Sequence, residues 1–194
     1  MRRLLPAAVM RIDQLMNTSQ QQSKDACWNY ILELYSRRDV SDACLFLQDH
    51  AGVDVAFFLA IVYYATRKNV QFRSEDLERL SKVASRWQND IIVPLRAVRR
   101  RVKTTQPLDD QTSHDIGLYS QMKSVEIAAE KAEVFSLIPL LEIMPAGGGR
   151  SDVNRTSGIL QYIFMQIPRG HEIQKHAIEG AALSVLDAAK LVSI

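Results

Sequence analysis

Residues 55–65 read VAFFLAIVYYA, and this run of eleven apolar residues decides the fold. Asp54 stands just before the run, where its carboxylate can accept hydrogen bonds from the free N–H groups of a helix. Asn69 provides a natural stop. Two buried strands are an alternative, but these boundaries and the length favour a helix. Because the helix is apolar on nearly every side, we expect it at the buried centre of the protein.

The composition is that of an ordinary globular protein. Apolar residues make up 47% of the 194 residues, and the net charge is +2, so no global charge argues for nucleic acid. The apolar run is much shorter than the roughly 20 residues of a bilayer span. The opening MRRLLPAAVM is closed by Arg11 and Asp13, which argues against export. Cys27 and Cys44 are expected to be buried thiols in a reducing compartment. We therefore expect a cytoplasmic protein.

Helical periodicity surrounds the central run. Trp28, Ile31, Leu32 and Tyr35 recur at helical spacing from Asp25 onward. Further helical patterns follow at 41–52, 74–87 and 114–139, and Pro94 predicts a kink or a new helix start. We find no strand alternation, so the sequence predicts an all-α fold, a compact helical bundle with a C-terminal helical pair. The expected divisions are a flexible N-terminal arm (1–22), the bundle (23–143), a Gly-rich linker (144–156) and a C-terminal helical segment (157–194).

Residues 89–103, NDIIVPLRAVRRRVK, contain a cationic stripe. On a helix, a first group of residues forms an apolar seam that should face the core: Ile91, Leu95, Val98 and Val102. A second group shares a different face: Arg96, Arg99, Arg100 and Lys103. Arg101 points elsewhere. Like charges at this spacing repel one another, which suggests that an anionic group lies opposite.

The next predicted helix offers that group, since Glu126, Glu130 and Glu133 lie on one face. An antiparallel hairpin through 104–113 would bring the two faces together as an internal ion-pair ladder that sets the register. This is the interpretation that we favour. Four bases would meet three acids, which leaves positive charge for an anionic partner. In such a ladder, reversing the charge of Arg99 should destabilise the fold.

Three other functions compete with a purely structural ladder. The arginines could bind phosphates of RNA or DNA, although aromatic residues for base stacking are missing nearby apart from Trp87. They could dock an acidic protein partner. An enzyme is the third possibility, with a polar pocket between the two helices, a glutamate as general base and arginines that hold an anionic substrate. It would need a concave pocket and a glutamate with a raised pKa.

Motifs for cofactors, metals and catalysis are missing. HEIQKH (171–176) spaces its histidines five residues apart, which places them about 140° apart on a helix, unlike the zinc-binding HExxH. GGGR (147–150) lacks the Lys-Ser/Thr of a phosphate-binding loop. We therefore predict no catalytic residue, no metal and no cofactor, and a non-catalytic helical binding or adaptor protein.

Three segments together resemble a bacterial family of unknown function that is typical of proteobacteria. They are CWNYILELYSRRDVSDACLFLQDHAGVDV (27–55), Trp87 with IIVPLRAVRRRVK (91–103), and KSVEIAAEKAE (123–133). The resemblance covers about residues 26–135. It implies an all-α fold and one recurring unit that comprises Gln48, Asp54, Arg96, Arg99, Arg100, Glu126 and Glu130. The chain departs from the family at Ala56, where several members have Asn.

Overall fold

The computed structural model describes residues 4–105, 114–147, 152–166 and 175–192. These residues form helices and no strand, with one isolated bridge between Val70 and Ala146, so the all-α prediction is confirmed. The elements are α1 (Leu4–Ser36), α2 (Arg38–Ala51), α3 (Val55–Arg67), α4 (Ser74–Trp87), the π-helical turn η1 (Gln88–Ile92), α5 (Val93–Thr105), α6 (His114–Glu142), α7 (Asp152–Gln166) and α8 (Lys175–Leu191). None of the described helices combines the length and apolar character needed to cross a membrane.

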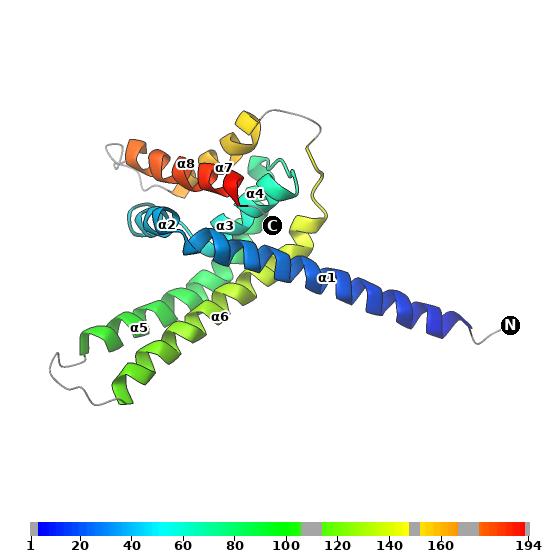
Figure 1. The fold of residues 1–194 in the computed structure, drawn as a ribbon, viewed down its shortest axis with the longest axis horizontal. Coiled ribbons are helices and arrows are strands. Elements are labelled where there is room, and N and C mark those ends of the chain that lie inside the picture. Colours follow the sequence, from blue (N-terminus) through cyan, green and yellow to red (C-terminus); the bar gives the residue numbers. More distant parts are fainter. Residues whose placement is uncertain (1–3, 106–113, 148–151, 167–174, 193–194) are drawn as a thin grey trace.

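Helix α3 is the buried centre, as the sequence predicts. Asp54 caps its N-terminus, since its Oδ1 atom accepts a hydrogen bond from the Phe57 N–H at 3.1 Å. Every residue from Ala56 to Ala65 is buried. Helices α1, α2, α6, α7 and α8 pack around α3 (Figure 1). Covering it on all sides is what an apolar helix requires.

The first helix is longer than the sequence suggests. We expected helical structure from Asp25, after an arm at 1–22, but α1 runs without a break from Leu4 to Ser36. The polar segment NTSQQQSK contains no glycine or proline, so nothing in it stops a helix that the buried residues downstream have already nucleated. The first half of α1 extends away from the other helices (Figure 1).

The two C-terminal helices belong to the core. Helix α8 packs along α2 and buries six apolar residues: Ile178, Ala182, Val185, Leu186, Ala188 and Ala189. Helix α7 packs on α3 and α4 and begins at Asp152, inside the segment expected to be a linker. The start of that segment is also held, because the Gly147 N–H donates to the Asn69 carbonyl at 2.7 Å. Segment 157–194 thus completes the bundle in its described part.

Helices α4 and α5 form one continuous helical segment through η1. Pro94 cannot donate a hydrogen bond, and its ring would clash with the carbonyl four residues earlier. The chain meets this restriction with a wider turn, in which the Val93 N–H bonds to the Gln88 carbonyl five residues before it. The π turn thus lies where a kink or a new helix start was predicted, and α5 begins at Val93.

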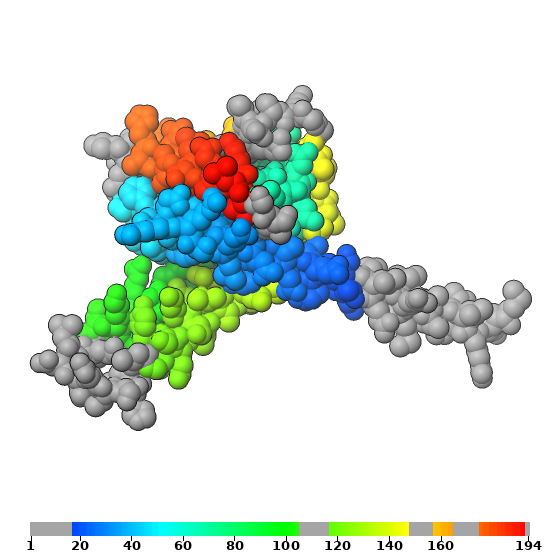
Figure 2. All heavy atoms as spheres, viewed as in Figure 1, coloured from blue at the N-terminus to red at the C-terminus, as the bar shows by residue number. Residues whose placement is uncertain are grey.

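Helix α5 places part of its predicted apolar seam in solvent, whereas Arg96 and Arg99 meet glutamates of α6 as predicted. Ile91 and Val98 of the apolar seam are 39% and 48% exposed, whereas the arginine face turns inward toward α6. The α5–α6 hairpin extends from the body of the protein (Figures 1 and 2). Its helices contact each other through arginine stems and their glutamate partners. Ile91 and Val98 of the seam are therefore left facing solvent, whereas Leu95 and Val102 are half-buried.

Candidate functional site

Arg96 is the centre of an ion-pair cluster between α5 and α6. Its Nε atom donates to Glu126 Oε1 at 2.8 Å, and its Nη2 atom donates to Glu130 Oε1 at 3.0 Å. The side chain of Arg96 is only 16% exposed. A guanidinium group can bind two carboxylates at once because its donors diverge in one plane. Arg96 therefore fixes the register of the hairpin.

The neighbouring arginines lie on opposite flanks of Arg96, because each residue turns a helix by about 100°. Arg99 points along α6 and donates to Glu126 and to the Tyr119 hydroxyl, the latter at 3.2 Å. Arg100 instead reaches α2, where it forms a largely exposed ion pair with Asp49 at 3.4 Å. The predicted single ladder is thus two diverging sets of contacts.

The remaining cations of the stripe lie toward the far end of the hairpin. Lys103 is exposed and has no ion-pair partner among the described residues. Arg101 is exposed as well. Neither residue lines the cleft described below.

The pKa values of the two glutamates that bind Arg96 shift in opposite directions. Burial opposes ionisation of Glu126, but hydrogen bonds from Arg99 and Arg96 outweigh it and lower its pKa. Burial raises the pKa of Glu130, and the attraction of Arg96 offsets this only in part. Two carboxyl groups on one helix face therefore sit in different environments.

Glu133 departs from the expected pairing with the arginines. It is fully buried, and its Oε2 atom accepts from Gln88 Nε2 of the π turn at 3.2 Å. Its carboxyl group also lies beside that of Asp54. Burial, together with the neighbouring Asp54, raises the pKa of Glu133. Glu133 lies seven residues after Glu126 and therefore on the same face of α6. It is about one turn beyond Glu130, where Gln88 is its hydrogen-bond donor in place of an arginine.

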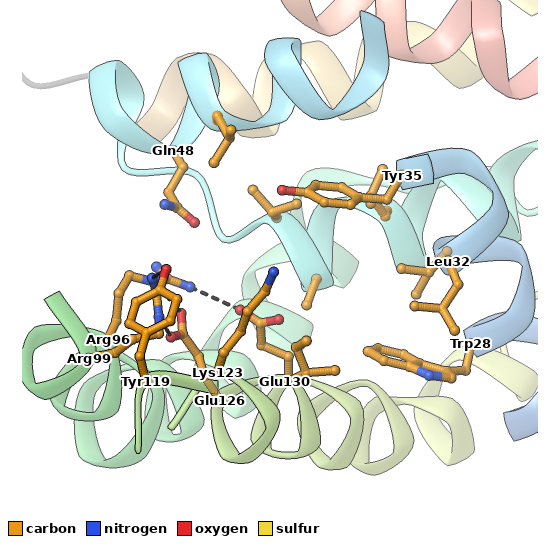
Figure 3. Close-up of a pocket in the computed structure, with 16 residues that line it drawn as sticks. Trp28, Leu32, Tyr35, Gln48, Arg96, Arg99, Tyr119, Lys123, Glu126 and Glu130 are labelled. Atoms are coloured by element: carbon orange, nitrogen blue, oxygen red, sulfur yellow. Dashed lines mark hydrogen bonds and ion pairs between the residues drawn. The ribbon is translucent and has the colours of Figure 1, made fainter. Parts of the chain in front are cut away.

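A cleft with a volume of about 440 Å³ lies where the hairpin meets the body. It is not between α5 and α6, as an enzyme pocket was expected to be, but between their inner face and helices α1, α2 and α3 (Figure 3). Its apolar wall comes from α1 to α3 and from Ile127 of α6. This wall consists of Trp28, Ile31, Leu32, Tyr35, Leu45, Val55, Ala56, Leu59 and Ile127.

The opposite end of the cleft is polar. It is formed by Gln48 of α2 together with Arg96, Arg99, Tyr119, Lys123, Glu126 and Glu130. Leu32 and Leu45 remain 49% and 46% exposed, so the cleft opens to solvent. A cavity of this size with apolar walls and a few convergent polar groups is typical of sites for small molecules.

Lys123 and Tyr119 are the site residues that sequence reasoning missed. Lys123 extends from α6 into the cleft (Figure 3) and has no ion-pair partner among the described residues. Both continue the spacing of Glu126 and Glu130 backward by whole turns, so the helical period could have identified them. Of the predicted anion-binding residues, Arg96 and Arg99 line the cleft, whereas Arg100, Arg101 and Lys103 do not.

These features define an all-α protein in which a two-helix hairpin and the body enclose a cleft of ligand size. The chain matches the family described as protein of unknown function (DUF2390) over residues 26–137, more than half its length, and it belongs to that family. Every residue that lines the cleft lies inside the matched segment, whereas α7 and α8 lie outside it. No curated protein and no solved structure matches the chain.

Proposed function

We propose that the protein is a non-catalytic binding protein whose cleft takes a small amphipathic anion, with an apolar body and a carboxylate or similar head. The observation that carries this proposal is the position of Lys123 in the cleft. Its ammonium group has no ion-pair partner among the described residues, and it faces a wall of aromatic and aliphatic side chains. Burial of such a wall against a ligand is favourable by about 25 cal/mol per Å².

The charges around the cleft favour an anion over a cation. Arg96, Arg99 and Lys123 contribute three positive charges, against the two carboxyl groups of Glu126 and Glu130. Both arginines already hold carboxylates, whereas Lys123 has no ion-pair partner among the described residues, so we expect Lys123 to bind the ligand head group. Tyr119 and Gln48 add neutral hydrogen-bonding groups at the same end.

The test compares three ligands with the same ten-carbon chain: decanoate, decanol and decyltrimethylammonium. Isothermal titration calorimetry should show the tightest binding for decanoate. The Lys123→Gln variant should bind decanoate about fivefold more weakly, as expected for one partly exposed ion pair. Lys82→Gln, at an exposed lysine of α4 outside the cleft, is the matched control.

The apolar wall is tested separately. Leu32→Gln should weaken both decanoate and decanol, whereas Leu183→Gln, at a similarly exposed leucine of α8, should weaken neither. Absence of binding by all three ligands to the folded protein would contradict the proposal. Equal binding of the three ligands would contradict the proposed preference for an anionic head group.

An enzyme is the second candidate function, because Glu130 lines the cleft and burial raises its pKa. A glutamate whose pKa is raised can act as a general base near neutral pH. The p-nitrophenyl ester of decanoic acid is a suitable probe. Hydrolysis that falls at least tenfold in Glu130→Gln, with decanoate binding retained, would favour catalysis.

Macromolecular partners are a weaker alternative. An acidic protein or a nucleic acid would have to use the exposed Arg101 and Lys103 at the end of the hairpin, since Arg96 and Arg99 are engaged by glutamates. Retention on heparin with a strong salt dependence, lost in Arg101→Ala/Lys103→Ala, would favour this alternative. The buried, unpaired thiols of Cys27 and Cys44 support the further proposal of a reducing, bacterial cytoplasmic setting.

A further inference from the structure

Two carboxyl groups meet next to residues that line the cleft: Glu133 is fully buried, and Asp54 is half-buried with its Oδ2 atom buried. Asp54 ends the loop before α3, and its Oδ1 atom accepts from the Phe57 N–H. Glu133 of α6 accepts from Gln88 of the π turn through Oε2. The other two oxygens, Asp54 Oδ2 and Glu133 Oε1, are buried and receive no hydrogen bond from any N–H or hydroxyl group that the structure describes.

The two carboxyl groups lie close enough to interact, and each has one buried oxygen that no described donor satisfies. A carboxylate can only accept hydrogen bonds, so these two oxygens can satisfy each other only if one of the carboxyl groups carries a proton. Two adjacent carboxylates without a proton would place two like charges in a buried site, which is strongly unfavourable. We propose that Asp54 and Glu133 share one proton and form a pH-sensitive joint that holds the start of α3 against α6 and the π turn.

The surrounding groups do not supply charge to replace that proton. From α5, Arg96 attracts the pair, but it already binds Glu126 and Glu130. Glu130 of α6 repels the pair. From α7, Tyr162 is a neutral neighbour whose pKa is raised by burial and by the two acids.

The remaining contacts of the pair are neutral donors, Gln88 and the Phe57 amide. No second arginine or lysine pairs with either acid in the described part of the chain. The joint therefore keeps one negative charge and one proton in a closed polar site.

The position of the joint links it to the cleft. Asp54 is followed directly by Val55 and Ala56, and Glu133 lies one turn beyond Glu130; all three of these neighbours line the cleft. Removing the proton would therefore separate two of the elements that form the cleft. This inference does not depend on which ligand the cleft takes.

The sign of the pH dependence follows from the raised pKa of Glu133. Above about pH 4.5, the usual pKa for glutamate, the unfolded chain releases this proton while the folded chain keeps it. The folded state then binds more protons than the unfolded state, so stability falls as pH rises. One retained proton corresponds to a tenfold decrease in the folding equilibrium constant for each pH unit.

The test is urea denaturation between pH 5.5 and 8 for the full-length protein and for Glu133→Gln. The glutamine amide can donate to Asp54 without a titrating proton. The ratio of the variant's folding equilibrium constant to that of the wild type should therefore rise by up to tenfold with each pH unit. Asp54→Asn should do the same. Glu78→Gln, at an exposed glutamate of α4, is the matched control and should follow the wild-type profile.

Infrared spectroscopy gives an independent readout that needs no stability measurement. The wild-type protein at pH 7 should show a carboxylic acid C=O band that disappears on raising the pH and is reduced in Glu133→Gln. If Glu133→Gln fails to fold, Asp54→Asn and the wild-type pH titration decide. A wild-type protein without a carboxylic acid band at pH 7, or with a stability profile parallel to those of both variants, would overturn the proposal.

Discussion

Arg96 donates to Glu126 at 2.8 Å between two helices, with only 16% and 7% of the two side chains exposed. Because both charges are largely removed from water, each depends on the other for its solvation. Glu130 completes the arrangement as a second acceptor for the same guanidinium group. The basic and acidic helices therefore form one unit whose inner face is a wall of the cleft.

We expect Arg96→Met to lower the free energy of unfolding by about 3 kcal/mol, because it leaves Glu126 and Glu130 buried with less compensation. Urea denaturation at pH 7 measures the change. Arg38→Met is the control, since Arg38 and Asp42 form an exposed pair at 3.8 Å, and its effect should stay below about 0.5 kcal/mol. Equal effects in the two variants would contradict the cluster.

Charge reversal at Arg99 should be at least as harmful. Arg99→Glu places a third acid beside Glu126 and removes a donor to Tyr119, so we expect a loss of about 3 kcal/mol or more. The same reversal at Arg86, an exposed residue of α4, should change stability little. A cooperative thermal transition at the wild-type temperature for Arg99→Glu would exclude an internal ion-pair unit.

Acid should weaken the cluster through Glu126. Its pKa in the folded protein is lowered from 4.5, so the unfolded chain takes up this proton at a higher pH than the folded chain does. The stabilisation is fully present above pH 4.5 and is lost as the pH falls through the lowered value. Below pH 4.5, the unfolding free energy should therefore fall more steeply for the wild type than for Glu126→Gln. Parallel slopes would contradict this assignment.

The C-terminal helices should be required for stability. Ile178 is fully buried in α8, and Ile178→Ala should cost about 3 kcal/mol through lost burial and the cavity that remains. Leu191, at the end of the same helix, is 70% exposed, and Leu191→Ala should cost less than about 0.5 kcal/mol. If Ile178→Ala were as stable as Leu191→Ala, α8 would not be part of the core.

Two helical glycines should respond in opposite directions to alanine. A Cβ atom at Gly158 would lie 2.7 Å from the Phe72 carbonyl oxygen, so Gly158→Ala should destabilise the contact of α7 by about 1–3 kcal/mol. A Cβ atom at Gly180 meets nothing within 4 Å, so Gly180→Ala should stabilise α8 by about 0.5–1 kcal/mol. Thermal denaturation of both variants would show the contrast, and a stabilised Gly158→Ala would contradict the close approach.

Several elements could be predicted from local sequence because local chemistry defines them. Asp54 caps α3, Gly52 ends α2 with φ 64°, and Asn69 adopts a left-handed φ of 57° after α3. An apolar helix must be buried whatever surrounds it, so the centre of the fold followed from residues 55–65 alone. The helical period also placed Trp28, Ile31, Leu32 and Tyr35 together, and all four line the cleft.

The errors concern which face of a helix meets which neighbour. The seam of Ile91 and Val98 has a helical period, but periodicity does not state whether a core or solvent faces it. The arginines of α5 turned inward because glutamates of α6 were available to neutralise them at close range. The sequence predicted that pairing, but only the packing of the helices could decide whether the apolar seam faces a core or solvent.

The sequence by itself determined that the chain is helical, where its main helices end and that α3 is buried, because caps, breakers and apolar spacing act within one or two turns. The tertiary structure decided what residues far apart in the chain do together. It made a cleft from α1, α2, α3, α5 and α6, and it placed Asp54 against Glu133 across 79 positions of sequence. Those contacts depend on packing between helices, which no local pattern specifies.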